Sequence, residues 1–588
     1  MSRPHWGWQD PLEASLLPAV SAESLMGHAR AIAAWERESG SPGEARAFDY
    51  IESCLKGYGL EVERREIEAY ISLPLESRVL LPDGTVIGAL THSFSTSTGP
   101  EGLEAELVDG GDGTVETLAR AGARGKLALV DNFATPAKAW AAQEAGTIGQ
   151  LFTNLDHLHN MIVTTIWGTP TPETAWRIPR LPCCSIKKAD ADRLRARIEE
   201  AGPLRVRLVT RVRTEWMPIP HLTGHLAGAE EAFTLFSGHV DAWHHGAMDN
   251  GSANATMLEV ARLLGGHRGA LRRGLRLAFW SGHSHGRYAG SAWYADHAWR
   301  ELERHGVLHL NVDSTGARGA TDFTVFHATE DAADFAEAVV ADVTGQRGRA
   351  RHFSRAGDQS FWGIGLPSAF MSMSQLPPQD TEFGRTTERL FGTSGFPWWW
   401  HTREDTIDKL DGAVLAHDTK VFVASALRLC NGPVLPLGPA RAARAVADTA
   451  AELHAAAGGR MDLSPLVDAA RGLAASLDAA APGLASLAAD GRGDTAGANR
   501  LLMRLSRALV PLLFTGGDRF THDLAVGIPP LAGLQRAREL PGMDAAADLT
   551  KFSLAALGRE RNRAHHALDV AADLAAELGA RVPQGEIR

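Results

Sequence analysis

One short loop contains the residues that are most suited to chemistry. Within 238–250 the chain places His239, Asp241 and Asp249 directly after an apolar run at 233–236. Buried charged groups of this kind need a partner or a metal ion to be tolerated. Imidazole and carboxylate ligands together suit zinc. The loop therefore predicts a metal site at the end of a buried strand.

Two later segments supply matching ligands, and a third supplies histidines. Asp313 follows the apolar run at 307–312, and His401 follows three consecutive tryptophans. The segment 280–291 reads Trp-Ser-Gly-His-Ser-His-Gly-Arg-Tyr-Ala-Gly-Ser and adds His283 and His285.

The order His-x-Asp, Asp-Asn, Asp and His, running from His239 to His401, resembles the co-catalytic zinc peptidase family. That family contains bacterial aminopeptidases, glutamate carboxypeptidase, glutaminyl cyclase and the metal-free transferrin receptor. The resemblance implies that His239 and Asp313 hold one metal ion, that Asp249 bridges, and that His401 holds a second ion. It also implies that Asp241 hydrogen-bonds His239 and fixes its tautomer.

One motif departs from this family. Its Gly-Glu-Glu-x-Gly segment supplies a general base and a metal ligand, but here 282–286 reads Gly-His-Ser-His-Gly. Alignment from the first glycine makes His283 the base and Ser284 the ligand, whereas alignment from 290–291 makes Ser284 the base and His285 the ligand. Because alternate residues of an extended chain share a face, we favour His283 as the base and His285 as a ligand.

The replacement changes the charge of the site. An imidazole in place of a carboxylate leaves more positive charge on the metals, so a second ion would bind weakly or only with an anionic substrate. We expect one or two zinc ions, or another divalent metal. A histidine with a pKa near 6.5 still suits a base at neutral pH. Carbonyl polarisation would fall on the metal, Arg287, His244 or His245, and Arg287 could instead clamp a carboxylate or lie on the surface.

These residues favour a metal-dependent hydrolase of amide bonds, in peptide-like or small-molecule substrates, with a histidine as the base. One alternative is a non-hydrolytic, metal-dependent cyclase or C–N lyase. Another is a non-catalytic receptor-like or scaffold-like homologue, which would be expected to show scattered loss of ligands.

The surrounding elements predict how these residues are positioned. From 215 to 435, apolar runs alternate with helical segments at 254–264 and 290–305. This alternation predicts an open mixed α/β sheet with helices on both faces, as in zinc aminopeptidases, with the site at the carboxyl ends of the strands. His239, His283, Asp313 and Asp358 all lie beside such runs.

Three parts are expected along the chain. The catalytic domain would comprise 1–72 and 214–435, and a β-rich insertion at 73–213 resembles a protease-associated domain. Beyond a hinge, 436–588 is rich in Ala and Leu at helical spacing, with a loop at 478–494. This helical domain resembles a dimerisation element, so we expect a homodimer.

Composition limits the partners of the chain. The net charge of −11 argues against nucleic acid or an anionic membrane as a partner. No apolar run approaches the ~20 residues of a membrane span, and no basic leader precedes an apolar core, so we expect a cytoplasmic protein. Four cysteines in this length do not make a disulfide framework. The expected partner is a small or short peptide-like substrate.

Overall fold

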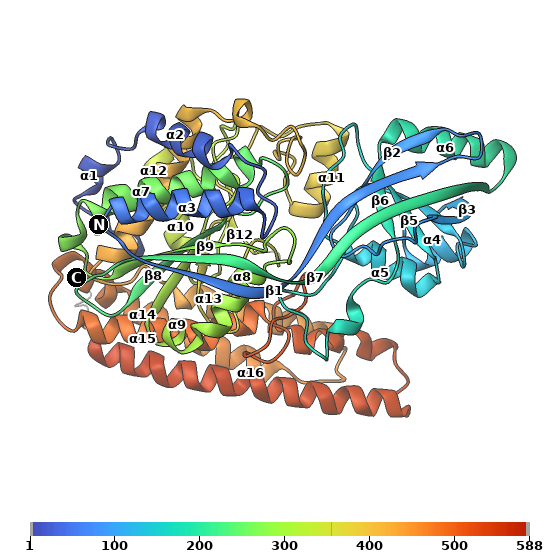
Figure 1. Ribbon diagram of the computed structural model, residues 1–588. Coiled ribbons are helices and arrows are strands. Elements are labelled where there is room, and N and C mark those ends of the chain that lie inside the picture. The colour runs from blue at the N-terminus through green and yellow to red at the C-terminus, as the bar shows by residue number, and fades with distance from the viewer. Residues whose placement is uncertain (1–3, 354, 584–588) are drawn as a thin grey trace.

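A mixed sheet of eleven strands organises the molecule (Figure 1). The computed structural model describes residues 4–353 and 355–583. In sheet order the strands are β1 (Glu61–Leu80), β2 (Val86–Thr91), β6 (Cys183–Ile186), β5 (Gly149–Thr153), β4 (Leu127–Asp131), β3 (Leu103–Asp109), β7 (Leu204–Leu226), β9 (Gly274–Trp280), β8 (Phe233–His239), β10 (Gly306–Asn311) and β13 (Ser368–Ala369). A separate pair is formed by β11 (Val325–His327) and β12 (Arg349–Arg351).

Helices cover both faces of the catalytic end of this sheet. One face packs on α2 (Ala22–Ile32), α3 (Pro42–Gly57), α7 (Ala253–Gly265), α10 (Ala333–Thr344) and α12 (Gly412–Asn431), and the other on α8 (Ala289–His297) and α9 (Trp299–His305). Ser21 and Ser41 cap α2 and α3 by accepting from backbone N–H groups three residues on. The predicted open mixed α/β sheet is therefore confirmed.

The shorter helices complete the chain. They are η1 (His5–Gly7), α1 (Glu13–Leu16), η2 (Ala175–Arg177), η3 (Ala247–Ser252), η4 (Arg268–Ala270), α11 (Glu382–Phe391), η5 (Ile407–Lys409) and η6 (Ala532–Gly542).

A long two-stranded ribbon joins the catalytic part to a second lobe. Strands β1 and β7 pair antiparallel along their length, with one irregularity between Pro74 and Glu76. Figure 1 shows both strands running from the catalytic helices into the second lobe. The predicted limits of the insertion, at 72–73 and 213–214, lie within these two strands.

The second lobe has its own hydrophobic cores. Strands β3, β4, β5 and β6 are parallel neighbours, and α4 (Val115–Arg120), α5 (Pro136–Ala145) and α6 (Lys188–Ala201) pack with them. Two clusters of buried apolar side chains, one containing Val130 and the other Leu129, lie on opposite sides of β4. Opposite orientation of successive strand residues explains this separation.

Four long helices form the C-terminal part: α13 (Pro439–Ala456), α14 (Ser464–Asp490), α15 (Thr495–Phe514) and α16 (Asp548–Arg581). The loop predicted at 478–494 is largely wrong, because α14 continues through Pro482 to Asp490. Leu477, Leu484 and Leu487 stay buried at helical spacing and hold this last part against the core.

The length and composition of α14 correct another expectation. By those two criteria alone, this helix could cross a membrane, although we expected no segment of that kind. In the structure α14 packs against α13 and α16 and buries one face among leucines and alanines. Those contacts are typical of a core helix within a helical bundle.

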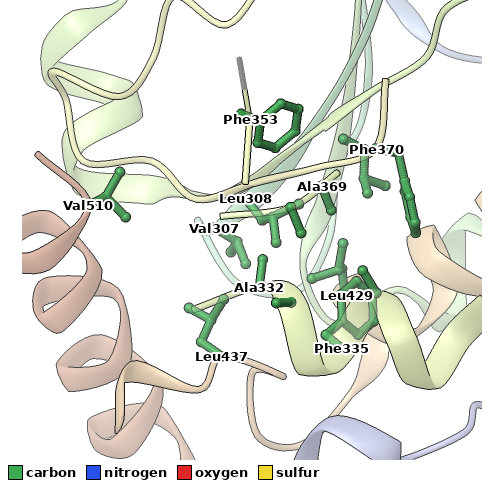
Figure 2. Close-up of a cluster of buried hydrophobic side chains, with 14 of the residues drawn as sticks. Val307, Leu308, Ala332, Phe335, Phe353, Ala369, Phe370, Leu429, Leu437 and Val510 are labelled. Carbon is green, nitrogen blue, oxygen red and sulfur yellow. The ribbon is translucent and has the colours of Figure 1, made fainter. Parts of the chain in front are cut away.

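The C-terminal helices share one core with the catalytic part. Figure 2 shows Val307 and Leu308 of β10 near Leu429 of α12, with Leu437 and Val510 from the C-terminal part beside them. The same continuous cluster extends to Val582.

Candidate metal centre

Three parallel strands bring the candidate residues to one edge of the sheet. Strand β8 pairs in parallel with β9 and with β10. His239 ends β8, while His283 and Asp313 follow the ends of β9 and β10 by a few residues. Side chains at the carboxyl ends of adjacent parallel strands meet in this way. Asp249 joins them from η3, directly after the β8 loop.

Asp249 lies between two imidazoles. Its Oδ1 is 3.2 Å from Nε2 of His239, and its Oδ2 is 3.2 Å from Nε2 of His401. The Oδ2 of Asp313 lies 3.5 Å from the same His239 nitrogen. One carboxylate thus presents an oxygen to each histidine, as a bridging ligand would.

The donor set fits a divalent metal. Ligand atoms of His239, His283 and Asp313 lie within 4.8 Å of one another. The Nε2 of His239 is buried and has no hydrogen-bond partner among the described residues. Neutral imidazole nitrogens and carboxylate oxygens are ligands that zinc accepts. His239 and Asp313 of this group would hold it, together with Asp249 and His401, whose contacts of 3.2 Å join them to the same cluster.

Electrostatics also favour a cation here. Burial by itself lowers the pKa of His239, but the carboxylates of Asp249 and Asp313 hold that pKa well above its usual range. Burial raises the pKa of Asp249, but His239 and His401 outweigh it and hold the pKa well below its usual range. A metal ion would compete with the proton for this site, so its affinity should fall at low pH.

His283 is held from behind by a carboxylate. Its Nδ1 lies 2.8 Å from Oδ2 of Asp358, a buried residue in the turn before β13. The His283 ring stacks on the His239 ring, with centroids 3.6 Å apart and planes 11° apart. A carboxylate at one imidazole nitrogen fixes the ring and leaves the other nitrogen for chemistry.

His285 does not enter this group. Residues 284–287 form a turn rather than extended chain, so His283 and His285 do not share a face. The His285 ring is fully buried against Trp243, with centroids 4.3 Å apart, and its Nδ1 lies 3.0 Å from Oγ of Ser39. This geometry corrects the expectation that both histidines face the metals.

Asp241 acts through a different atom from the one expected. The Nδ1 of His239 hydrogen-bonds the backbone carbonyl of Asp241 at 2.7 Å, whereas the carboxylate is 3.8 Å away. That carboxylate instead accepts from Oγ of Ser39 at 2.7 Å and from the backbone N–H groups of His283 and Ser284. Asp241 therefore positions both His239 and the turn that carries His283.

Two buried residues that sequence reasoning missed hold the metal loop. The Arg37 guanidinium donates to the carbonyl oxygens of Val240 and Gly246, each at 2.9 Å. Asp405 accepts from the backbone N–H groups of Met248 and Asp249, each at 2.9 Å, and burial raises its pKa to about 7. Asp405 lies four residues after His401, but no spacing rule in the sequence links it to the loop.

A cavity of about 270 Å³ opens onto the metal ligands. Asp249, Asp313, His283 and His401 line it, together with the aromatic rings of Trp243, Tyr288 and Trp400. Residues 134–136 and 161–162 of the second lobe, and 525–527 of the C-terminal part, complete the wall. A larger cavity of about 460 Å³ between α15 and α16 contains none of the metal ligands.

The candidates for carbonyl polarisation separate into two groups. Arg287 is partly buried and lines the cavity, so it is not a surface arginine. His244 hydrogen-bonds Oδ1 of Asn160 at 3.1 Å, and burial lowers its pKa to about 4. His245 hydrogen-bonds the carbonyl of Ala33 at 3.0 Å. Neither of these two histidines lines the cavity, and both serve the packing of the loop.

Comparison with known proteins agrees with this geometry. Residues 222–426, which contain all the metal-ligand candidates, match the sequence model of Peptidase family M28. The probable glutamate carboxypeptidase VP8 of Zea mays is 25% identical over 501 residues, which cover 71% of this chain and 68% of that protein. The probable lipoprotein aminopeptidase LpqL of Mycobacterium tuberculosis is 25% identical over 372 residues, covering 61% of this chain and 68% of that protein.

Solved structures share the fold. The aminopeptidase from Aneurinibacillus sp. strain AM-1 superposes with a TM-score of 0.54 at 20% identity, covering 71% of this chain and 96% of that one. A zinc aminopeptidase from Bacillus subtilis gives a TM-score of 0.53 at 19% identity, covering 69% and 94%.

Proposed function

We propose that the protein is a zinc-dependent hydrolase of peptide-like amide bonds in which His283, oriented by Asp358, acts as the base. One observation carries the proposal: His239, Asp249, Asp313 and His401 converge on a cavity whose wall includes His283. These residues lie in the segment that matches Peptidase family M28, and the relatives are named as a carboxypeptidase and an aminopeptidase.

Each metal-holding residue has a defined task. His239 and Asp313 would hold one ion, Asp249 would bridge, and His401 would hold a second. When bound, a divalent metal polarises the substrate carbonyl and lowers the pKa of water. Asp405 and Arg37 keep the loop that carries Asp249 in place.

His283 would accept, at its Nε2, the proton that the attacking water loses as its oxygen adds to the substrate carbonyl carbon. Donation from Nδ1 to Asp358 selects the tautomer with a free Nε2 and stabilises the imidazolium that forms. The proton then passes from His283 to the leaving nitrogen. No glutamate among the described residues lines the cavity, which supports a histidine in this role.

Further features are proposed on sequence grounds. These are the cytoplasmic location, the homodimer through the C-terminal helices, and the protease-associated character of 73–213.

The cavity volume suits a short peptide or small amide rather than a long chain.

Metal depletion and reloading test the proposed reaction. The protein stripped of metal should be inactive on a panel of dipeptides and N-acyl amino acids, and zinc, cobalt or manganese should restore turnover. Asp249→Ala should lose metal and turnover together, because its carboxylate contacts both His239 and His401. Full metal occupancy without turnover of any amide would contradict hydrolysis. Products without solvent-derived oxygen would favour a cyclase or lyase.

A further inference from the structure

Arg287 lines the cavity, and no described residue serves as its counter-ion. His283, four residues earlier in the chain and directly before the turn at 284–287, lines the same cavity. Among the described residues its side chain has no ion pair and no hydrogen bond, and its Nε is buried without a partner. Its backbone is fixed, because Gly168 donates to its carbonyl oxygen at 2.7 Å.

Arg355 brings a second positive charge to the same wall. This residue is 8% exposed and lines the cavity. Its guanidinium donates to the carbonyl oxygen of Asp523 at 3.2 and 3.1 Å and more weakly to that of Gln359 at 3.4 Å. No carboxylate among the described residues forms an ion pair with it. The carbonyls hold the guanidinium in place without neutralising it.

Aromatic rings fix both arginines near the reacting group. The Tyr288 ring lies 4.8 Å from the His283 ring and 4.1 Å from the Trp167 ring, measured between centroids. The Arg287 guanidinium carbon is 5.6 Å from the Tyr288 centroid, and that of Arg355 is 4.2 Å from the Trp167 centroid. One ring, that of Tyr288, therefore separates the Arg287 guanidinium from His283. Two rings, those of Trp167 and Tyr288, separate the Arg355 guanidinium from His283.

Another buried arginine of this chain, Arg428, shows how a buried guanidinium is usually neutralised. Arg428 pairs with Glu13 at 2.8 Å and with Asp342 at 3.0 Å. A buried charge without such a partner is costly, so a cavity-facing guanidinium of this kind suits an anionic ligand. The planar fork of arginine matches a carboxylate in particular.

We infer that Arg287, supported by Arg355, forms a subsite for a carboxylate of the substrate beside the metal centre. The inference rests on the proposed function and narrows its substrate class to carboxylate-bearing amides, such as short peptides with a free or side-chain carboxylate.

Three dipeptides that lose one carboxylate at a time test this subsite: alanyl-glutamate, alanyl-glutamine and alanyl-glutamine amide. In the zinc-loaded enzyme kcat/KM should fall along the series. Arg287→Met should lower kcat/KM for the first two by roughly 10- to 100-fold, the size of a charged hydrogen bond, and so reduce the preference over the amide. Arg287→Lys should retain only part of the wild-type preference for the carboxylate-bearing dipeptides. An unchanged preference in Arg287→Met would overturn the inference.

Arg385→Met is the matched control. Arg385 lies on α11, is exposed and does not line the cavity. Among the described residues it forms an ion pair only with exposed Asp380. This variant should keep the wild-type preference. Because the Arg287 side chain makes no hydrogen bond among the described residues, Arg287→Met should fold, and its melting temperature verifies this.

Glutarate binding separates this inference from the reaction itself. Calorimetry on the zinc-loaded protein measures the affinity for this dicarboxylate without any turnover. If no dipeptide is hydrolysed, glutarate binding that weakens at least about tenfold in Arg287→Met, but not in Arg385→Met, still supports the subsite. Equal affinity in both variants, or no binding to the wild type, overturns it.

Discussion

The two nitrogens of His283 have different surroundings. Nδ1 hydrogen-bonds buried Asp358, and a ring nitrogen of His283 lies within 4.8 Å of ligand atoms of His239 and Asp313. A carboxylate behind an imidazole serves a general base and a metal ligand equally well. The geometry therefore identifies Asp358 as a positioning residue. Measuring kcat and the metal content of variants decides whether His283 is a general base or a metal ligand.

Asp358→Asn should lower kcat by roughly 10²- to 10⁴-fold, because the amide no longer selects the correct His283 tautomer. Zinc content, measured by elemental analysis, should stay at the wild-type value. His283→Ala combined with Asp358→Asn should be no slower than His283→Ala alone, since the two residues act as a unit. Loss of zinc in Asp358→Asn would instead identify His283 as a ligand.

The order of motifs in the sequence was enough to predict most of the residues that meet in the site. His239 and Asp313 follow buried runs, and such runs end at one edge of a parallel sheet. Asp249 and His401 reach this edge from η3 and from the turn at 398–401, and the order of the family motif indicated them. The prediction for His285 was wrong because it assumed extended chain where the backbone turns.

Other residues of the site could not be predicted from local pattern. Ser39 contacts Asp241 across 202 positions of sequence, and Arg37 reaches Gly246 across 209. Contacts of this range depend on how distant loops pack, which no periodicity encodes. Arg355 and its stacking on Trp167 depend on the packing of the second lobe in the same way.

At the scale of elements, strands buried on both faces were the clearest to predict. All residues of β8 and β10 are buried, and continuous apolar runs are typical of parallel strands. The Ala- and Gly-rich composition of 478–494 suggested a loop, but α14 continues to Asp490, because burial of the leucines after Pro482 outweighs the hydrogen bond that the proline removes.

Helix α12 fixes the loop after β10 through one carboxyl group. Asp418 accepts from the backbone N–H of Gly316 at 2.7 Å and from Oγ of Ser374 at 2.9 Å. Burial raises the pKa of Asp418 from 3.8 to about 7, and its Oδ1 has no partner among the described residues. The fold therefore holds the proton on this group up to near neutral pH.

Asp418→Asn should flatten the pH dependence of stability. Between pH 3.8 and about 7 the unfolded Asp418 is deprotonated while the folded one keeps its proton. The free energy of unfolding contributed by this group therefore falls as pH rises through that window, by up to about 4 kcal/mol. Urea unfolding at several pH values should show this slope in the wild type and a smaller slope in the variant. Identical slopes would contradict the shifted pKa.

At the scale of the molecule, the reactive cavity lies where three parts of the chain meet. The catalytic part supplies the metal ligands, the second lobe supplies 134–136 and 161–162, and the C-terminal part supplies 525–527. Ala525 is tied to the second-lobe side by a hydrogen bond from its N–H to the carbonyl of Thr165 at 2.7 Å. The shape of the cavity thus depends on contacts between parts that sequence patterns treat as separate.

The clusters of buried side chains do not join all three parts of the chain, although all three parts line the cavity. One cluster of buried side chains joins the catalytic part to the C-terminal helices through residues such as Leu437 and Val510 (Figure 2). The strands of the second lobe lie in two other clusters, and only one of these includes a catalytic-part residue, Trp243. Elements that share a core unfold together, and elements with separate cores open independently.

Leu437→Ala should therefore weaken the catalytic part and the C-terminal helices together. Leu437 is fully buried, so its truncation should cost about 2–5 kcal/mol of unfolding free energy. Hydrogen–deuterium exchange should show equal loss of protection in β10 and α15, while β4 of the second lobe keeps its protection. Leu549→Ala, at an exposed leucine of α16, is the control and should change neither. Loss of protection confined to α15 would show that the C-terminal helices fold as an independent unit.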